Sequence, residues 1–140
     1  MNNLLDKLGY SSHFRKLFEE LDNPSLVPAR IVAENKHNYL AATQNGELLA
    51  ELPGKMLHKA LAVSEHPCVG DFVALDLSNE KGRSQIRYVL RRKSRFARLT
   101  GSKRKEEQLL ASNIDLVFIV QGLDRDYNLR RLERYVVQSY

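Results

Sequence analysis

The chain has 140 residues, which allows one domain, or a small domain and part of a second. Its composition is typical of a globular protein, and no apolar run approaches the roughly 20 residues that a membrane-spanning helix needs. The single cysteine, Cys68, excludes an internal disulfide and a cysteine-rich zinc site, and the first residues do not resemble a secretory signal. We therefore expect a cytoplasmic protein.

Positive charge is concentrated in one segment of the chain. The formal net charge is +5, and residues 83–105 hold ten of the 22 Lys and Arg and no acidic residue. The other residues carry the remaining 12 Lys and Arg against 17 Asp and Glu, so they are acidic overall. A concentrated basic segment on an otherwise acidic chain indicates a polyanion-binding surface. A solvated charged face or a flexible linker is the alternative interpretation.

Residues 1–26 are predicted to form a helical extension. A helix is expected to begin near Ser11, which can cap it, and to end before Pro24. The apolar residues at helical spacing are Phe14, Leu17, Phe18 and Leu21. We interpret this stripe as a face that packs against a neighbouring element rather than as a binding face.

Residues 27–95 are predicted to form a small β-barrel. Strands are expected at residues 30–34, 38–43, 47–52, 69–77 and 85–90. Asn45-Gly46 indicates a hairpin, because both central residues of a type I′ turn need a positive φ, which Asn and Gly tolerate best. Residues 55–63 fit either a short helix or a strand. Five strands with one irregular stretch match the OB-fold, although other small barrels, such as SH3-like ones, stay open.

The rest of the chain changes character twice. Residues 96–108 are expected to form a basic linker, because Thr100-Gly101-Ser102 has the composition of a flexible turn. Residues 109–140 are expected to form the first βα unit of an α/β domain. Residues 114–120 are almost entirely apolar, which suits a strand buried on both faces of a parallel sheet, and Asn128 can cap the helix that follows. One such unit cannot bury a parallel strand, so we expect the chain to be an N-terminal fragment.

Four segments resemble one family in the same order along the chain. They are residues 69–73 (VGDFV), 90–98 (LRRKSRFAR), 108–124 (QLLASNIDLVFIVQGLD) and 126–135 (DYNLRRLERY). Together they resemble the ribosome small-subunit-dependent GTPases, the RsgA or YjeQ family, over about residues 27–140. The Asn-Ile-Asp and Asn-Leu-Arg-Arg-Leu-Glu-Arg-Tyr pieces are the most specific.

The resemblance implies an N-terminal OB domain that contacts ribosomal RNA, a circularly permuted GTPase domain and a C-terminal zinc-binding domain. It implies a GTP hydrolase that is stimulated by the small ribosomal subunit and acts late in the maturation of that subunit. GTP, magnesium and zinc are the cofactors it implies for the full-length protein. The expected partners are the small ribosomal subunit and its RNA, without a membrane, and the full-length protein is expected to be monomeric.

The sequence lacks the motifs of that GTPase chemistry. A P-loop needs Gly-x-x-x-x-Gly-Lys-Ser/Thr, because its backbone N–H groups and Lys bind phosphates, and no segment fits. Residues 35–38 (NKHN) resemble the guanine-specific Asn-Lys-x-Asp motif but end in Asn where a carboxylate is needed, so we interpret them as a turn. The scattered histidines have no metal-ligand spacing, and Cys68 is expected to be buried. We therefore expect no catalytic residue, cofactor or metal ligand in this chain, which should be inactive as an enzyme.

The candidate RNA contacts come from the basic segment and from aromatic residues of the barrel. Lys and Arg bind phosphates, and aromatic rings stack on bases. Phe72 alternates with Ala74, so it is expected in the core instead. The predicted RNA contacts are Arg91, Arg92, Lys93, Arg95, Arg98, Lys103, Arg104, Lys105, Tyr39 and Tyr88. The alternative for residues 91–95 is a structural role, in which ion pairs fix the barrel against the next domain.

These patterns predict the RNA-binding OB module of a ribosome biogenesis GTPase. One alternative is a free-standing OB-fold nucleic-acid binder without enzymatic activity, which the apolar strand at residues 116–120 argues against. The other is a protein-interaction module whose basic segment binds an acidic partner. Apolar surface left without a neighbour is expected to favour self-association of the chain.

Overall fold

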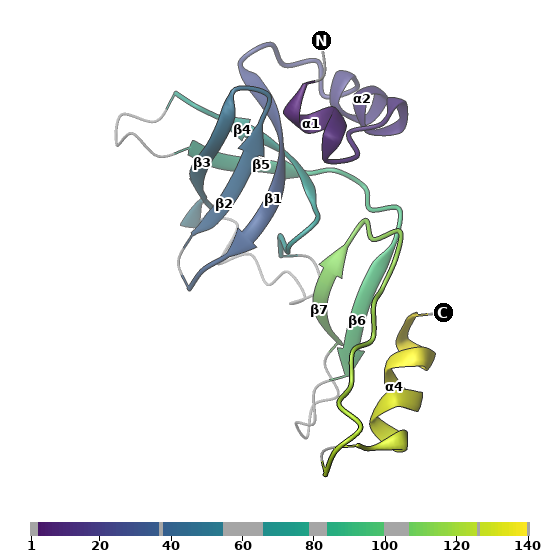
Figure 1. Ribbon diagram of the computed structural model, residues 1–140. Helices are drawn as coiled ribbons and strands as arrows, with labels where there is room; N and C mark the ends of the chain where they lie inside the picture. Colours follow the sequence, from purple (N-terminus) through teal and green to yellow (C-terminus); the bar gives the residue numbers. More distant parts are fainter. Residues whose placement is uncertain are drawn as a thin grey trace.

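The structure, a computed structural model, describes residues 3–36, 38–54, 66–78, 84–99, 107–125 and 127–139. It consists mainly of β-strands, with a barrel, two helices beside it, a separate strand hairpin and a C-terminal helix (Figure 1). No helix in this part of the chain is long and apolar enough to cross a membrane.

Five strands close into a barrel, as predicted. They are β1 (Leu26–Glu34), β2 (Tyr39–Thr43), β3 (Gly46–Glu51), β4 (Phe72–Asp76) and β5 (Ser84–Val89). Their order around the barrel is β1-β2-β3-β5-β4, and β4 pairs with β1 to close it. Only β3 and β5 pair in parallel among these strands. This arrangement confirms the OB-fold. Residues 55–63, for which helix and strand stayed open, lie outside the described residues.

The hairpin between β2 and β3 is confirmed, but its turn differs from the predicted one. Thr43 pairs with Gly46, so Gln44 and Asn45 are the central residues of the turn. Only Gly46 has a positive φ, of 126°, which excludes a type I′ turn at Asn45-Gly46. The Thr43 hydroxyl accepts a hydrogen bond from the Asn45 backbone and donates one to the Gly46 carbonyl, so a side chain stabilises the turn.

The barrel interior is filled by small and branched apolar side chains. Its buried residues are Ala29, Ile31, Ala41, Ala50, Leu52, Val73, Leu75 and Ile86. They alternate along their strands, which is the pattern that predicted the strands. The β4 strand is buried on both faces, because Val73 and Leu75 point inward while Phe72 lies outside the barrel under the helices.

Two helices cover the outside of the barrel beside β4. They are α1 (Leu4–Lys7), which the sequence did not predict, and α2 (Ser12–Glu19), which it did. Phe14 of α2 lies with its ring centroid 4.2 Å from that of Phe72. These two residues form one buried cluster with Leu5, Tyr10 and Leu90. The apolar stripe of α2 is therefore a packing face, as predicted.

A hairpin occupies much of the segment predicted as a linker. Strand β6 (Arg95–Leu99) pairs antiparallel with β7 (Glu107–Ser112), and Figure 1 shows the pair extending away from the barrel. The central part of the predicted linker, residues 100–106, lies outside the described residues. The basic segment thus includes an ordered strand, because β7 supplies a partner that the composition alone does not reveal.

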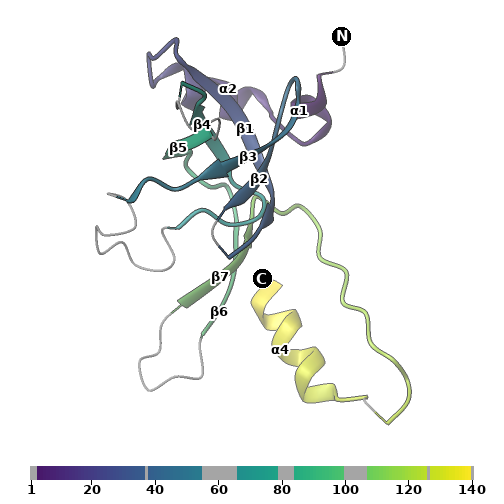
Figure 2. The same cartoon turned by 90° about the vertical axis from the view of Figure 1, so that its left-hand side faces the viewer.

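The apolar segment at residues 114–120 is not a strand, contrary to the prediction. It is an extended connection that leaves β7 and leads to α4 (Leu129–Ser139), as Figure 2 shows. Phe118 and Val120 are 82% and 92% exposed. A parallel strand needs neighbours to satisfy its backbone, and none of the described strands lies beside this segment. The predicted cap of α4 is confirmed, because the Asn128 side chain accepts a hydrogen bond from the Arg131 backbone.

Candidate nucleic-acid interface

Four of the predicted RNA contacts lie exposed where the chain leaves the barrel and enters the hairpin. They are Arg91, Lys93, Arg95 and Arg98. Arg91 and Lys93 belong to the connection that follows β5, whereas Arg95 and Arg98 belong to β6. Of the other four cations of the predicted set, Lys103, Arg104 and Lys105 lie outside the described residues, and Arg92 is partly buried. The structure therefore presents a row of cations along one stretch of backbone.

The exposed cations make only weak contacts with the rest of the chain. Arg95 pairs with Glu107 at 2.6 Å, and Arg98 donates to the Gln108 side chain at 3.0 Å. Lys93 lies 5.1 Å from the centroid of the Phe14 ring and donates to the Ser11 hydroxyl. Exposed pairs of this kind contribute at most about 1 kcal/mol to stability, so a phosphate can replace them at little cost.

Arg92 differs from its neighbours because it forms a partly buried ion pair, while its RNA contact stays a prediction. Its side chain is only 12% exposed, and its guanidinium holds both oxygens of the fully buried Asp71 carboxylate at 2.7 Å. It also donates to the His66 carbonyl at 2.8 Å. The hydrogen bond with Asp71 is the largest of the effects that raise the pKa of Arg92. This ion pair fits the structural role that was the alternative interpretation.

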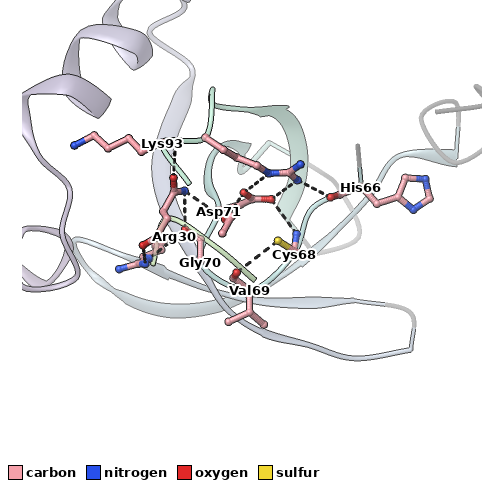
Figure 3. A network of polar contacts seen from close by, with 10 residues as sticks. Arg30, His66, Cys68, Val69, Gly70, Asp71 and Lys93 are labelled. Atoms are coloured by element: carbon pink, nitrogen blue, oxygen red, sulfur yellow. Dashed lines mark hydrogen bonds and ion pairs between the residues drawn. The ribbon is translucent and has the colours of Figure 1, made fainter. Parts of the chain in front are cut away.

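Asp71 is the centre of a polar network that joins segments far apart in the sequence (Figure 3). Besides Arg92, its carboxylate accepts hydrogen bonds from the Cys68 backbone at 2.9 Å and from the Ser112 hydroxyl at 2.5 Å. A buried carboxylate is tolerated only when its charge is paired and its oxygens are hydrogen-bonded, and both conditions are met here. The sequence analysis missed this role of Asp71, although its place in the quoted VGDFV segment was the available signal.

Gly70 and Asn113 bring the end of β7 against the start of β4. A Cβ atom on Gly70 would lie 2.0 Å from the Ser112 carbonyl oxygen, and its φ is +96°, so only glycine fits. The Asn113 side chain donates to the Gly70 carbonyl at 3.0 Å and accepts from the Lys93 backbone at 2.8 Å. Asn113 itself has a φ of 52°, a conformation that Asn tolerates better than most residues.

Arg30 of β1 adds a second, half-buried cation to the same place. Its guanidinium donates to the backbone carbonyls of Gly70, Asn113 and Leu8, and it lies 5.1 Å from the Phe72 ring centroid. Burial lowers the pKa of Arg30. Through these bonds the barrel, the hairpin and α1 meet at one residue, which the sequence analysis did not single out.

The aromatic residues of the barrel divide into buried and exposed ones. Phe72 is buried, as predicted. Tyr39 is half-buried against the barrel interior, and this burial raises its pKa to about 12. Tyr88 of β5 is 49% exposed, so its ring has the solvent access that stacking on a base requires. The RNA contacts of Tyr39 and Tyr88 stay predictions, and the geometry favours Tyr88.

Three features of the described residues bear on nucleotide and metal chemistry. Asn35 and Asn38 bond to each other through backbone and side chains, so this part of the segment NKHN forms the predicted turn between β1 and β2. Among the described residues, no three His, Cys, Asp or Glu gather as metal ligands do. Cys68 is buried as predicted, and burial raises the pKa of its thiol to about 12, which disfavours the reactive thiolate form.

Comparison with known proteins confirms the resemblance. No protein-family model matches the chain. The small ribosomal subunit biogenesis GTPase RsgA of Opitutus terrae is 38% identical over an alignment of 140 positions. The alignment covers 94% of this chain and 38% of that protein. RsgA 1 of Listeria innocua is 41% identical over 137 residues, which cover 98% of this chain and 36% of that protein.

A solved structure agrees with the fold. The crystal structure of YjeQ from Thermotoga maritima matches 81% of this chain and 37% of that chain, with a TM-score of 0.53 and 20% sequence identity. The chain therefore spans little more than a third of the length of the proteins that it matches.

Proposed function

Because the chain is related to the RsgA (YjeQ) family over nearly its whole length, we propose that it is the RNA-binding OB module of a small ribosomal subunit biogenesis GTPase. The observation that supports the RNA contact is the row of exposed cations at Arg91, Lys93, Arg95 and Arg98. Its target is the ribosomal RNA of the small subunit. The module binds phosphates through these cations and stacks Tyr88 on an unpaired base.

The chemistry of the full protein is part of the same proposal. It hydrolyses GTP in the cytoplasm late in the maturation of the small subunit, as a monomer, with magnesium and zinc as further cofactors. The present chain supplies affinity for the subunit and no catalytic group, because its sequence holds neither a P-loop nor an Asn-Lys-x-Asp motif. GTP binding therefore depends on sequence other than these 140 residues.

The proposal is tested by measuring how the chain binds purified small ribosomal subunits over a salt series, with large subunits as the comparison. Each phosphate contact adds about 0.7 to 0.9 to the slope of log K against log salt. The triple variant Arg91→Glu, Arg95→Glu, Arg98→Glu should lower this slope by about 2 or more and weaken binding at least tenfold. These side chains are exposed, so thermal unfolding should change little.

A matched variant reverses three other exposed cations, Lys7→Glu, Lys16→Glu and Arg130→Glu, and has the same net charge. It should keep most of the affinity and the steep salt slope, because none of its three changes belongs to the basic segment at residues 83–105. Equal losses in the two variants would mean that only net charge matters. The proposal is contradicted if the wild-type chain does not bind small subunits more tightly than large ones.

A further inference from the structure

Among the described residues, the hydrogen bonds between the hairpin and the barrel lie at the base of the hairpin. Strands β6 and β7 pair with each other, and β6 also contacts α4, but their contacts with the barrel strands are sparse among the described residues. Figure 1 shows the hairpin leaving the barrel at its base and pointing away from it. Whatever fixes the base therefore sets the direction of the whole hairpin.

The base is held by the network around Asp71. Ser112, the last residue of β7, donates its backbone N–H to the Val69 carbonyl at 2.9 Å and its hydroxyl to Asp71 at 2.5 Å. The Ser94 hydroxyl donates to the Ile114 carbonyl and accepts from the Ile114 backbone, at 3.0 and 2.9 Å. The two chain segments that enter and leave the hairpin are thus tied to each other and to the barrel.

These contacts leave little freedom at the base. Asp71 and Ser112 are fully buried, and Gly70 contacts the Ser112 backbone too closely for any side chain. Arg92 and Asn113 cross between the segments, with Arg92 bound to Asp71 and Asn113 bound to Gly70 and Lys93 (Figure 3). Charge-assisted bidentate bonds of the Arg92 kind fix direction as well as distance.

We propose that Asp71, Arg92, Ser94 and Asn113 are positioning residues that form a rigid joint, which sets the angle of the β6–β7 hairpin on the barrel. The joint places Arg95 and Arg98 so that they bind the same RNA as Arg91. This last step rests on the proposed function, whereas the rigidity of the joint does not.

The distances show why a fixed angle matters for binding. Leu99 lies four residues beyond Arg95, or about 13 Å along the strand. A tilt of about 30° at the base would move it by about 7 Å, more than twice the roughly 2.8 Å length of a charge-assisted hydrogen bond to a phosphate. A loose hairpin would keep all its cations but would no longer hold them in register with the phosphates.

The joint is tested with the double variant Ser94→Ala, Asn113→Gly. It removes the side-chain bonds of Ser94 and Asn113, and glycine keeps the positive φ of Asn113 free of strain. Asp71 and Arg92 stay unchanged, because removing one of them would leave a buried unpaired charge and threaten the fold itself. The matched control, Asn23→Gly, Ser25→Ala, removes equivalent side-chain bonds at an exposed site before β1.

The first measurement is the distance between spin labels at Glu47→Cys on the barrel and Leu110→Cys on the hairpin, both exposed positions. The wild-type chain without added cysteines shows whether the buried Cys68 takes up label. A narrow distance distribution in the wild type and in the control variant, broadened in the Ser94→Ala, Asn113→Gly variant, is the expected result. A distribution that stays narrow in that variant, or that is already broad in the wild type, overturns the joint.

The second measurement is the salt dependence of binding to purified small ribosomal subunits. Loosening the joint should lower the salt slope by about 1.5, which is the loss of two phosphate contacts, although no exposed cation is removed. Adding Arg95→Glu and Arg98→Glu to the loosened chain should then change little. An unchanged slope in a chain whose hairpin is demonstrably loose refutes the placement of Arg95 and Arg98. If even the wild-type chain fails to bind small subunits, the proposed function is contradicted. The label distances would still show whether the joint is rigid.

Discussion

The barrel and the C-terminal segment at residues 114–139 both carry runs of apolar residues, yet only the barrel buries them. Val73, Leu75 and Ile86 of the barrel are completely buried, whereas Phe118 and Val120 are almost completely exposed. Local hydrophobicity does not distinguish the two regions. The difference lies in their neighbours, because β4 is flanked by β1 and β5 while none of the described strands flanks residues 114–120.

The comparison shows that an apolar run indicates that a segment can be buried, whereas its neighbours decide whether it is. In the barrel each strand supplies the hydrogen-bonding edge and the apolar face that the next strand needs, and closure leaves no open edge. The sequence at residues 114–120 is suited to the interior of a sheet, but none of the described strands lies beside it. The exposed apolar side chains there are the basis of our expectation that the chain self-associates.

The largest effect is expected from truncating one apolar side chain in each region. Leu75→Ala should lower the free energy of unfolding of the barrel by about 2–5 kcal/mol, because Leu75 is completely buried and its loss leaves a cavity. Phe118→Ala removes a larger side chain but should change that free energy by less than about 0.5 kcal/mol, because Phe118 is already in solvent. Urea unfolding followed by far-ultraviolet circular dichroism measures both.

A similar loss in the two variants would show that Phe118 is buried in solution, for example by a second copy of the chain. Repeating the unfolding of Phe118→Ala over a range of protein concentrations separates these cases, because the stability of a dimer depends on protein concentration.

The strands of the barrel could be predicted from the sequence, because alternation and turn residues are local signals. The short helix α1 could not, since four residues give no periodicity. The β6–β7 hairpin was also missed. Its two strands lie on either side of a polar, basic stretch, and the pairing of Arg95 with Ser112 is a contact between positions remote in the sequence.

In the candidate site, too, contacts between remote positions could not be predicted from the sequence. Arg91 and Arg92 are adjacent and chemically identical, so the sequence predicted one role for both. In the structure Arg91 is exposed and Arg92 is bound to Asp71, which lies 21 residues earlier. A basic segment therefore indicates an interface, but only the tertiary partners show which of its cations are free to bind.

A smaller effect is expected at the helix ends, and it compares an exposed helix with one packed on the barrel. Asn128→Ala should destabilise α4 by about 1 kcal/mol, because the Asn128 side chain caps that helix and little packing supports it. Ser11→Ala should hardly affect α2, whose cap residue makes no side-chain capping bond and whose Phe14 is buried. Amide hydrogen exchange of the two helices measures both changes.

If Ser11→Ala increased exchange in α2 as much as Asn128→Ala does in α4, the packing of Phe14 on Phe72 would not be what holds α2. Equal protection of the two helices in the wild-type chain would likewise contradict the distinction between a supported and an unsupported region.

The smallest effect concerns the surface of the barrel, at Asp76 of β4. Hydrogen bonds from the Ser78 hydroxyl and backbone, together with Arg87, lower the pKa of Asp76 to about 2. Because this pKa lies below the usual value near 3.9 for Asp, the stabilisation it brings is complete above about pH 4 and is lost as the pH falls through 2. An NMR titration of the Asp76 carboxyl should show the low midpoint, and Ser78→Ala and Arg87→Ala should each raise it. Residues 114–139 should show no loss of structure in this pH range, because Asp76 stabilises only the barrel.

Loss of structure in residues 114–139 together with the barrel between pH 4 and 2 would contradict this comparison. It would mean that the two regions unfold as one unit, and that the exposed segment depends on the barrel more closely than its few contacts indicate.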